Sequence, residues 1–173
     1  MSAEQLAETI RLLVLDVDGV LSNGLLFYGQ SGEELKTFHI ADGLGIKLLM
    51  KHGIEVAIIT GRKSGMVEQR ARELGISHLV QGREDKLEAL NSLAKDLAIP
   101  LSGIAYMGDD LPDLGAIERV GLGMVPANAS PYVSGHADWR SQANGGMGAV
   151  REACEFILRC QGKLDAIRES YRA

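Results

Sequence analysis

The sequence predicts an α/β fold in which a central parallel β-sheet lies between layers of helices. Three observations predict it. Short apolar runs of strand length alternate along the chain with segments of helical periodicity. The apolar runs are continuous, as expected for strands that are buried on both faces. The 21 glycines are too many for a helical bundle and suit a fold with many tight turns.

The expected elements follow one another in alternating order. The first strand covers Leu12 to Leu15, and further core strands are expected over the segments 56–59, 79–80, 104–107 and 120–124. Helices are expected over the segments 43–52, 64–74, 87–97, 111–118 and, at the C-terminus, from residue 149 onward. Ser64 is expected to cap the second of these helices. Alternation of this kind predicts parallel strands joined by right-handed crossovers.

One segment departs from the alternation. The apolar stretches Leu25 to Tyr28 and Leu35 to His39 flank the turn-rich sequence Gly29-Gln30-Ser31-Gly32. Two such stretches around a glycine-containing turn predict a β-hairpin. The hairpin follows the first strand directly, so we expect it to form a flap at one edge of the sheet.

Length and composition limit the possible classes of protein. The 173 residues predict a single domain over 1–173, with the hairpin at about 24–39 and a C-terminal helix and tail at about 149–173. The net charge of −5 gives no support for nucleic-acid binding. The apolar runs are too short to cross a membrane, and the acidic N-terminus lacks a signal pattern. Cys154 and Cys160 are expected to be reduced thiols, so we expect a cytoplasmic protein.

Carboxylates follow two of the predicted strands. Asp16 and Asp18 come directly after the first strand, and Asp109, Asp110 and Asp113 follow the strand 104–107. The carboxyl ends of parallel strands meet at one edge of the sheet, where ligands bind. An oxygen-only cluster favours Mg²⁺, which commonly binds carboxylates, water and a phosphate oxygen. The alternative is that the aspartates of each cluster only cap a turn or a helix. Capping could account for either cluster alone, but it accounts less well for two clusters at strand ends in one chain.

Four separated motifs then occur in a characteristic order. They are Asp16-x-Asp18-Gly19-Val20, Thr60 after the second core strand, Lys86 at a helix start, and Gly108-Asp109-Asp110-x-x-Asp113. This ordered set resembles the haloacid dehalogenase superfamily. The resemblance implies a Rossmann-like three-layer sandwich and a magnesium-dependent phosphatase.

The resemblance also implies roles for the acidic residues. Asp16 would be the nucleophile that takes up phosphate and a ligand of the metal. Asp18 would protonate the leaving alcohol and later activate water, while its backbone carbonyl binds the metal. Asp109 would be the third metal ligand. An aspartate at the second position is typical of phosphatases, because an alcohol leaving group needs a proton.

The remaining motif residues would surround the phosphate. Thr60 and the following backbone amides, including that of Gly61, would hold the phosphoryl oxygens. Lys86 would place a positive charge beside the nucleophile and the transferring phosphate. Asp110 is expected to orient Lys86 or a metal-bound water. For Asp113 two alternatives stay open: the same orienting role, or a carboxylate on the helix surface.

The spacing of the motifs leaves no room for a separate cap domain. Between the first two motifs lie only the hairpin and one helix, and the segment from Thr60 to Lys86 is equally short. The chain therefore resembles the capless members of the superfamily.

A closer resemblance is to the family of 3-deoxy-D-manno-octulosonate 8-phosphate phosphatases. The segments that carry it are Asp16 to Gly24, Phe38 to Gly45, Thr60 to Arg62, Gly108 to Leu111 and Gly145 to Glu152. It implies a phosphorylated acidic eight-carbon sugar as substrate, on the route to lipopolysaccharide. Arg62 would pair with the sugar carboxylate, or else cap the Thr60 loop. A nine-carbon sialic-acid-like substrate and a non-catalytic interaction module remain alternatives.

This family resemblance also implies a homotetramer. Hairpins would pair between subunits, and neighbours would shield each active site. The apolar hairpin residues are too many for a lone flap in water. Besides the hairpin, the glycine-rich segment from Gly145 to Arg151 is a candidate to reach a neighbouring subunit. The alternative is a monomer whose hairpin folds back on its own domain.

Overall fold

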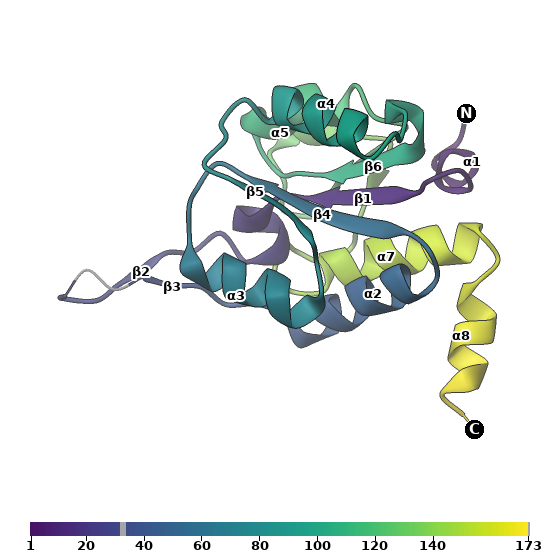
Figure 1. The fold of residues 1–173 in the computed structure, drawn as a ribbon, viewed down its shortest axis with the longest axis horizontal. Coiled ribbons are helices and arrows are strands. Elements are labelled where there is room, and N and C mark those ends of the chain that lie inside the picture. The colour runs from purple at the N-terminus through teal and green to yellow at the C-terminus, as the bar shows by residue number, and fades with distance from the viewer. Residues whose placement is uncertain (32–33, 173) are drawn as a thin grey trace.

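A six-stranded parallel sheet forms the centre of the computed structural model, which describes residues 1–31 and 34–172 (Figure 1). The strands lie in the order β5-β4-β1-β6-β7-β8. Their bounds are β1 (Leu12–Leu15), β4 (Glu55–Thr60), β5 (His78–Gln81), β6 (Ile104–Met107), β7 (Leu122–Val125) and β8 (Trp139–Arg140). Each neighbouring pair is parallel, which confirms the α/β class predicted from the sequence.

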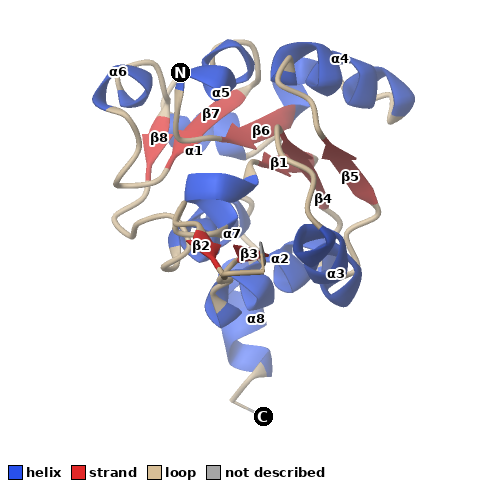
Figure 2. Ribbon diagram, turned by 90° about the vertical axis from the view of Figure 1, so that its left-hand side faces the viewer, coloured by secondary structure: helices blue, strands red, loops and turns tan. Residues whose placement is uncertain are grey.

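Helices cover both faces of this sheet (Figure 2). One face carries α2 (Ile40–Lys51), α3 (Gly65–Leu74) and α7 (Ala149–Cys160), with α1 (Ala3–Ala7) and α8 (Leu164–Ser170) packed beside α7. The other face carries α4 (Lys86–Asp96), α5 (Leu111–Ile117) and α6 (Pro131–Ser134). Two short helical turns, η1 (Val17–Leu21) and η2 (Leu101–Gly103), lie in the connections between these elements. None of the helices in residues 1–31 and 34–172 has the length and apolar character needed to span a membrane.

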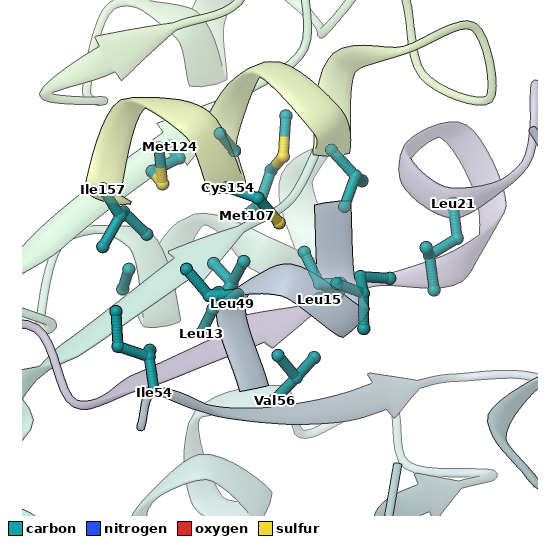
Figure 3. Packing of buried hydrophobic residues seen from close by; sticks show 14 of the residues in the cluster. Leu13, Leu15, Leu21, Leu49, Ile54, Val56, Met107, Met124, Cys154 and Ile157 are labelled. Atoms are coloured by element: carbon teal, nitrogen blue, oxygen red, sulfur yellow. The ribbon is translucent and has the colours of Figure 1, made fainter. Parts of the chain in front are cut away.

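The core consists of two apolar clusters separated by the sheet. Leu13 and Leu15 of β1 pack with Leu49 of α2 on one face (Figure 3). Leu12 and Val14 belong to the cluster on the other face. Successive side chains of a strand point to opposite faces, so a continuous apolar run serves both clusters. This double burial fixes β1 at the centre of the molecule.

The second helix begins at Ile40, earlier than the predicted segment 43–52. The glycines near its start reflect close packing rather than a helix boundary. A Cβ atom on Gly45 would lie 3.2 Å from the Cα of Arg151 in α7. The close approach of α2 and α7 therefore favours a residue without a side chain at this position.

The start of α7 is capped from another helix. Gly148 precedes α7 and has no side chain to accept a hydrogen bond. Asp42 of α2 fills this role, because the Arg151 amide donates to its Oδ1 atom at 2.8 Å. Burial raises the pKa of Asp42 above its ordinary value, although hydrogen bonds from the backbone amides of Arg151 and Gly148 oppose the shift. The C-terminal helix is thus fixed by a residue 109 positions away.

Several short elements were not predicted, namely α1, α6, α8 and β8. The prediction that Ser64 caps α3 through its side chain is wrong. Its buried hydroxyl has no hydrogen-bond partner in the part of the chain that the structure describes. The loop is held instead by the Ser64 amide, which donates to Gln81 Oε1 at 2.9 Å.

The hairpin is shorter than predicted and projects from the body of the molecule (Figure 1). Its paired strands are β2 (Phe27–Tyr28) and β3 (Glu34–Leu35). Gly32 of the predicted turn lies outside the described residues. The side chains of Leu25, Phe27, Tyr28 and Leu35 are between 49% and 69% exposed. The hairpin therefore presents apolar surface instead of folding back on the domain.

The glycine-rich segment before α7 lies against the chain's own η1 turn. The Gly146 amide donates to the Val20 carbonyl at 2.8 Å. A Cβ atom on Gly145 would lie 1.7 Å from the carbonyl oxygen of Gly19. Backbone contact therefore holds Gly145 and Gly146 within the subunit, and contact of this segment with a neighbouring subunit stays a prediction.

This close approach predicts a strong effect of Gly145→Ala. The added methyl group has no space, and overpacking of this kind typically costs about 1–3 kcal/mol. We expect the free energy of unfolding, measured with urea, to fall by that amount. Gly65→Ala is the matched control, because its Cβ meets nothing within 4 Å and starts a helix. Equal stability of the two variants would contradict the packing described.

Candidate active site

The carboxyl ends of β1, β4 and β6 bring separated residues to one edge of the sheet. Asp16 follows β1 directly, and its amide donates to the Met107 carbonyl of β6 at 3.0 Å. Thr60 is the last residue of β4. A cleft of about 600 Å³ lies at this edge. It is lined by Asp16, Asp18, Thr60, Gly61, Arg62, Glu84, Lys86 and Pro112.

The η1 turn passes very close to the next acidic cluster. Gly19 has a φ of +89°, a conformation that side-chain-bearing residues rarely adopt. A Cβ atom at this position would lie 2.0 Å from Oδ2 of Asp109. Glycine therefore serves twice here, allowing both the turn and the approach of its backbone to the Asp109 carboxylate.

Lys86 joins two buried carboxylates. It is the first residue of α4, and its Nζ atom lies 2.9 Å from Asp16 Oδ1 and 2.7 Å from Asp113 Oδ1. At most 5% of any of the three residues is exposed. Charges withdrawn from water to this extent are tolerated when they are paired and hydrogen-bonded. The ammonium group thus holds the residue after β1 against the helix that follows β6.

Asp113 is held by four donors. Besides Lys86, the Tyr106 hydroxyl donates to its Oδ1 atom at 2.7 Å. The amides of Asp109 and Asp110 donate to its Oδ2 atom at 3.2 Å and 3.4 Å. Both oxygens are therefore occupied by the chain itself. This leaves Asp113 suited to orient Lys86.

Two sequence-based expectations change accordingly. Asp110 was expected to orient Lys86 or a metal-bound water, and the first of these is wrong: its side chain is exposed and accepts a hydrogen bond from the Leu111 amide at 2.8 Å. It caps α5, and Asp113 makes the contact with Lys86. The alternative that Asp113 is a surface carboxylate is wrong, because the residue is 1% exposed. The helical turn points one carboxylate outward and the other inward.

The electrostatics show a deficit of positive charge. Burial, followed by the charge of Asp113, raises the pKa of Asp16 to about 7. The same two causes raise the pKa of Asp109 to about 6. Burial would lower the pKa of Lys86, but the charges of Asp16 and Asp113 outweigh it and raise that pKa. One lysine does not balance three neighbouring carboxylates near neutral pH.

The geometry fits a divalent cation. Among the described residues, Asp16, Asp109 and Asp113 each offer a carboxylate oxygen, and these oxygens lie within 4.8 Å of one another. Hard cations such as Mg²⁺ bind oxygen ligands of this kind, and a second positive charge would favour the ionised carboxylates. Since both oxygens of Asp113 already accept hydrogen bonds, Asp16 and Asp109 are the better-suited ligands.

Comparisons with known proteins identify the family. The family model for haloacid dehalogenase-like hydrolases matches residues 78–153. The 3-deoxy-D-manno-octulosonate 8-phosphate phosphatase KdsC of Escherichia coli (strain K12) is 53% identical over 159 residues, which cover 92% of this chain and 85% of that protein. This chain belongs to the KdsC family.

Solved structures of the KdsC family share the complete fold. The Moraxella catarrhalis 3-deoxy-D-manno-octulosonate 8-phosphate phosphatase, in complex with a magnesium ion, a phosphate ion and a KDO molecule, aligns with a TM-score of 0.96 and 48% identity. That alignment covers 98% of this chain and 97% of the other. The Yersinia pestis enzyme of the same name aligns with a TM-score of 0.93 and 47% identity, covering 94% and 88% of the two chains.

Within this KdsC-family chain, the structure gathers most of the predicted site residues. Asp16, Asp18, Thr60, Gly61, Arg62 and Lys86 line the cleft, and Asp109 and Asp113 adjoin Asp16. The carboxylate of Asp18 lies outside the carboxylate cluster and contacts Lys36 of the hairpin segment. Lys36 and Tyr106 were missed. Tyr106 could have been found from the sequence, because it places a hydroxyl group in the apolar strand 104–107, close to the Gly108-Asp109 motif.

The raised pKa values predict how magnesium and pH together affect stability. From an ordinary value of 3.8, Asp16 rises to about 7 and Asp109 to about 6. Without metal the folded state therefore binds more protons than the unfolded state between about pH 4 and pH 7, and its stability falls as the pH rises. Because Mg²⁺ binds the ionised carboxylates, we expect its stabilising effect to grow over the same range.

Thermal unfolding with EDTA or with Mg²⁺, at about pH 5 and about pH 8, tests this prediction. At a metal concentration about 100 times Kd, the expected stabilisation near pH 8 is about 2.7 kcal/mol. Asp16→Asn should remove most of the gain, whereas Asp96→Asn, on the exposed end of α4, should retain it. An equal gain at both pH values would refute the coupling.

Proposed function

We propose that this chain hydrolyses 3-deoxy-D-manno-octulosonate 8-phosphate to the free sugar acid and inorganic phosphate, with Mg²⁺ as cofactor, in lipopolysaccharide precursor synthesis. The observation that carries the proposal is the 2.9 Å contact between Lys86 and Asp16 inside a cleft that Thr60 and Arg62 also line. A buried carboxylate beside a buried ammonium, at a site open to a ligand, suits phosphoryl transfer. The 53% identity to KdsC supports this substrate.

In the first half of the reaction, a carboxylate oxygen of Asp16 attacks phosphorus. The bond between phosphorus and the C8 oxygen of the sugar breaks, and an aspartyl-phosphate forms. Asp18 gives its proton to the departing oxygen, so the sugar leaves as an alcohol. Lys86 binds Oδ1 of Asp16, which favours the ionised nucleophile.

In the second half, water replaces the aspartate. Asp18, now ionised, takes a proton from the water molecule as its oxygen attacks phosphorus. The bond between phosphorus and Asp16 breaks, inorganic phosphate leaves, and Asp16 is restored. Thr60 and Gly61 line the cleft, and the Thr60 side chain and the Gly61 amide would hold the phosphoryl oxygens.

Asp16, Asp109 and the backbone carbonyl of Asp18 would hold the magnesium ion. When bound, the ion neutralises charge on the phosphoryl oxygens. Asp113 keeps its contact with Lys86 throughout, so the ammonium group stays directed at Asp16. Asp110 serves the helix start.

The substrate carries a carboxylate remote from its phosphate. Arg62 lies on the cleft, two residues after Thr60, and a guanidinium binds carboxylates in a planar, charge-assisted manner. We assign it to the sugar acid. Glu84 lines the same cleft.

The chain would act as one catalytic unit over residues 1–173 in the cytoplasm, assembled as a homotetramer. The exposed apolar side chains of the hairpin support subunit contacts, since large apolar patches mark interfaces. A capless site leaves the carboxyl edge of the sheet open to water. A neighbouring subunit at the hairpin would cover it, and exclusion of bulk water favours the reaction.

Asp16→Asn should abolish hydrolysis of the sugar phosphate, because the amide of Asn cannot attack phosphorus in place of the carboxylate and is a poor ligand for Mg²⁺. Removal of Mg²⁺ with EDTA should abolish it reversibly. The measurement is phosphate release, with circular dichroism to verify folding and Asp96→Asn as the active control. Normal turnover by a clean Asp16→Asn preparation would overturn the mechanism.

Arg62→Ala should lower kcat/KM for the sugar acid phosphate far more than for a small phosphate without a carboxylate. Loss of one charge-assisted hydrogen bond typically costs about 1.5–3 kcal/mol, or roughly tenfold to a hundredfold. Arg72→Ala, on the exposed side of α3, is the matched control. Equal losses on both substrates would instead place Arg62 in the phosphate loop.

Light scattering at assay concentration should give four times the 18.6 kDa chain mass. Replacing both Phe27 and Tyr28 with Glu should lower that mass and the activity together, because charge opposes burial of the hairpin. Tyr171→Glu, which changes an exposed aromatic residue outside the hairpin, should leave both unchanged. A fully active monomer would show that no neighbour is required.

A further inference from the structure

Lys36 makes an unusual contact for a residue near a projecting hairpin. It follows β3 directly, and its ammonium group forms an ion pair with Oδ1 of Asp18. The Lys36 side chain is 1% exposed, whereas that of Asp18 is 26% exposed. Burying an ammonium group is costly unless it is paired, so this contact differs from the exposed ion pairs that contribute little.

The contact separates Asp18 from the rest of the carboxylates. Lys86, the first residue of α4, contacts Asp16 and Asp113, whereas Lys36, from the segment after β3, contacts Asp18. Asp18 lines the cleft but does not belong to the carboxylate cluster beside it. Two neighbouring aspartates of one turn are thus held by two different lysines.

We propose that Lys36 is a positioning residue that holds the Asp18 carboxylate in the orientation from which its proton reaches the leaving oxygen. This rests on the function proposed above, in which Asp18 is the acid and base. With Oδ1 held by Lys36, Oδ2 carries the proton to the sugar oxygen as the phosphorus–oxygen bond breaks. Proton transfer requires hydrogen-bond distance, so free rotation of Asp18 would slow it.

If Lys36 positions Asp18, the loss of rate on replacing Lys36 should depend on the leaving group of the substrate. An alkoxide leaves poorly and needs the proton from Asp18, whereas p-nitrophenolate leaves readily without one. A contact with the sugar carboxylate would affect only the acidic sugar substrate. A purely structural role would affect every substrate alike. Three phosphates therefore distinguish these roles: the sugar acid phosphate, a simple alkyl phosphate, and p-nitrophenyl phosphate.

We expect Lys36→Met, which keeps the apolar stem, to lower kcat/KM for both alkyl phosphates by about tenfold to a hundredfold, within the usual contribution of acid–base catalysis. kcat/KM for p-nitrophenyl phosphate should change by less than about threefold, because this ratio covers the steps up to departure of the leaving group and not the later attack of water. Lys36→Arg should restore most of the loss. Lys47→Met, an exposed lysine of α2, is the matched control and should match the unchanged chain. If Lys36→Met is less stable to heat, Lys36→Gln takes its place.

A double-variant cycle gives the second readout. In an Asp18→Asn background, Lys36→Met should cause no further loss on the alkyl phosphates, because the group it positions is absent. Additive losses, equal losses on alkyl and aryl phosphates, or a loss confined to the acidic sugar would each overturn the proposal. If the unchanged chain shows no preference for the sugar acid phosphate, the proposed substrate fails, while the alkyl-to-aryl comparison still decides the role of Lys36.

Discussion

The buried ammonium group of Lys86 compensates two buried carboxylates, and the arrangement of the site depends on that contact. It joins the residue after β1 to the first turn of α5, through the first residue of α4. Removing one partner of such a buried group typically costs about 3–5 kcal/mol, because a charge is left uncompensated. The hydroxyl of Tyr106 and two backbone amides complete the shell around Asp113. The nucleophile is therefore held by groups that are themselves fixed.

Close backbone approach makes this density of charge possible. Gly19 brings the η1 turn against Asp109, and Gly145 lies against the carbonyl of Gly19 on the other side. The turn that carries Asp16 and Asp18 is thus enclosed by an acidic side chain and a glycine segment from distant parts of the chain. Lys36 adds a contact from the hairpin. A rigid turn suits phosphoryl transfer, in which positioning and charge neutralisation supply most of the rate.

The sequence was informative where local order determines position. Parallel strands place their carboxyl ends together, so residues directly after a strand, such as Asp16 and Thr60, could be assigned to one edge. Which of Asp110 and Asp113 contacts Lys86 could not be predicted, because both residues lie at the start of α5. The orientation of that helix against Tyr106 decides which carboxylate points inward. The contact of Asp42 with the amide of Arg151 joins residues 109 positions apart and leaves no local pattern. The short elements β8 and α8 have too few residues to show a period.

Asp16, held by Lys86, is expected to become phosphorylated during turnover. Borohydride reduces an aspartyl-phosphate to homoserine, so adding it to the enzyme during steady-state hydrolysis marks the phosphorylated residue for mass spectrometry of the digested chain. We expect homoserine at position 16 when substrate and Mg²⁺ are present, and unmodified aspartate when either is omitted. Sustained turnover without modification at Asp16, or with the modification at another aspartate, would contradict it.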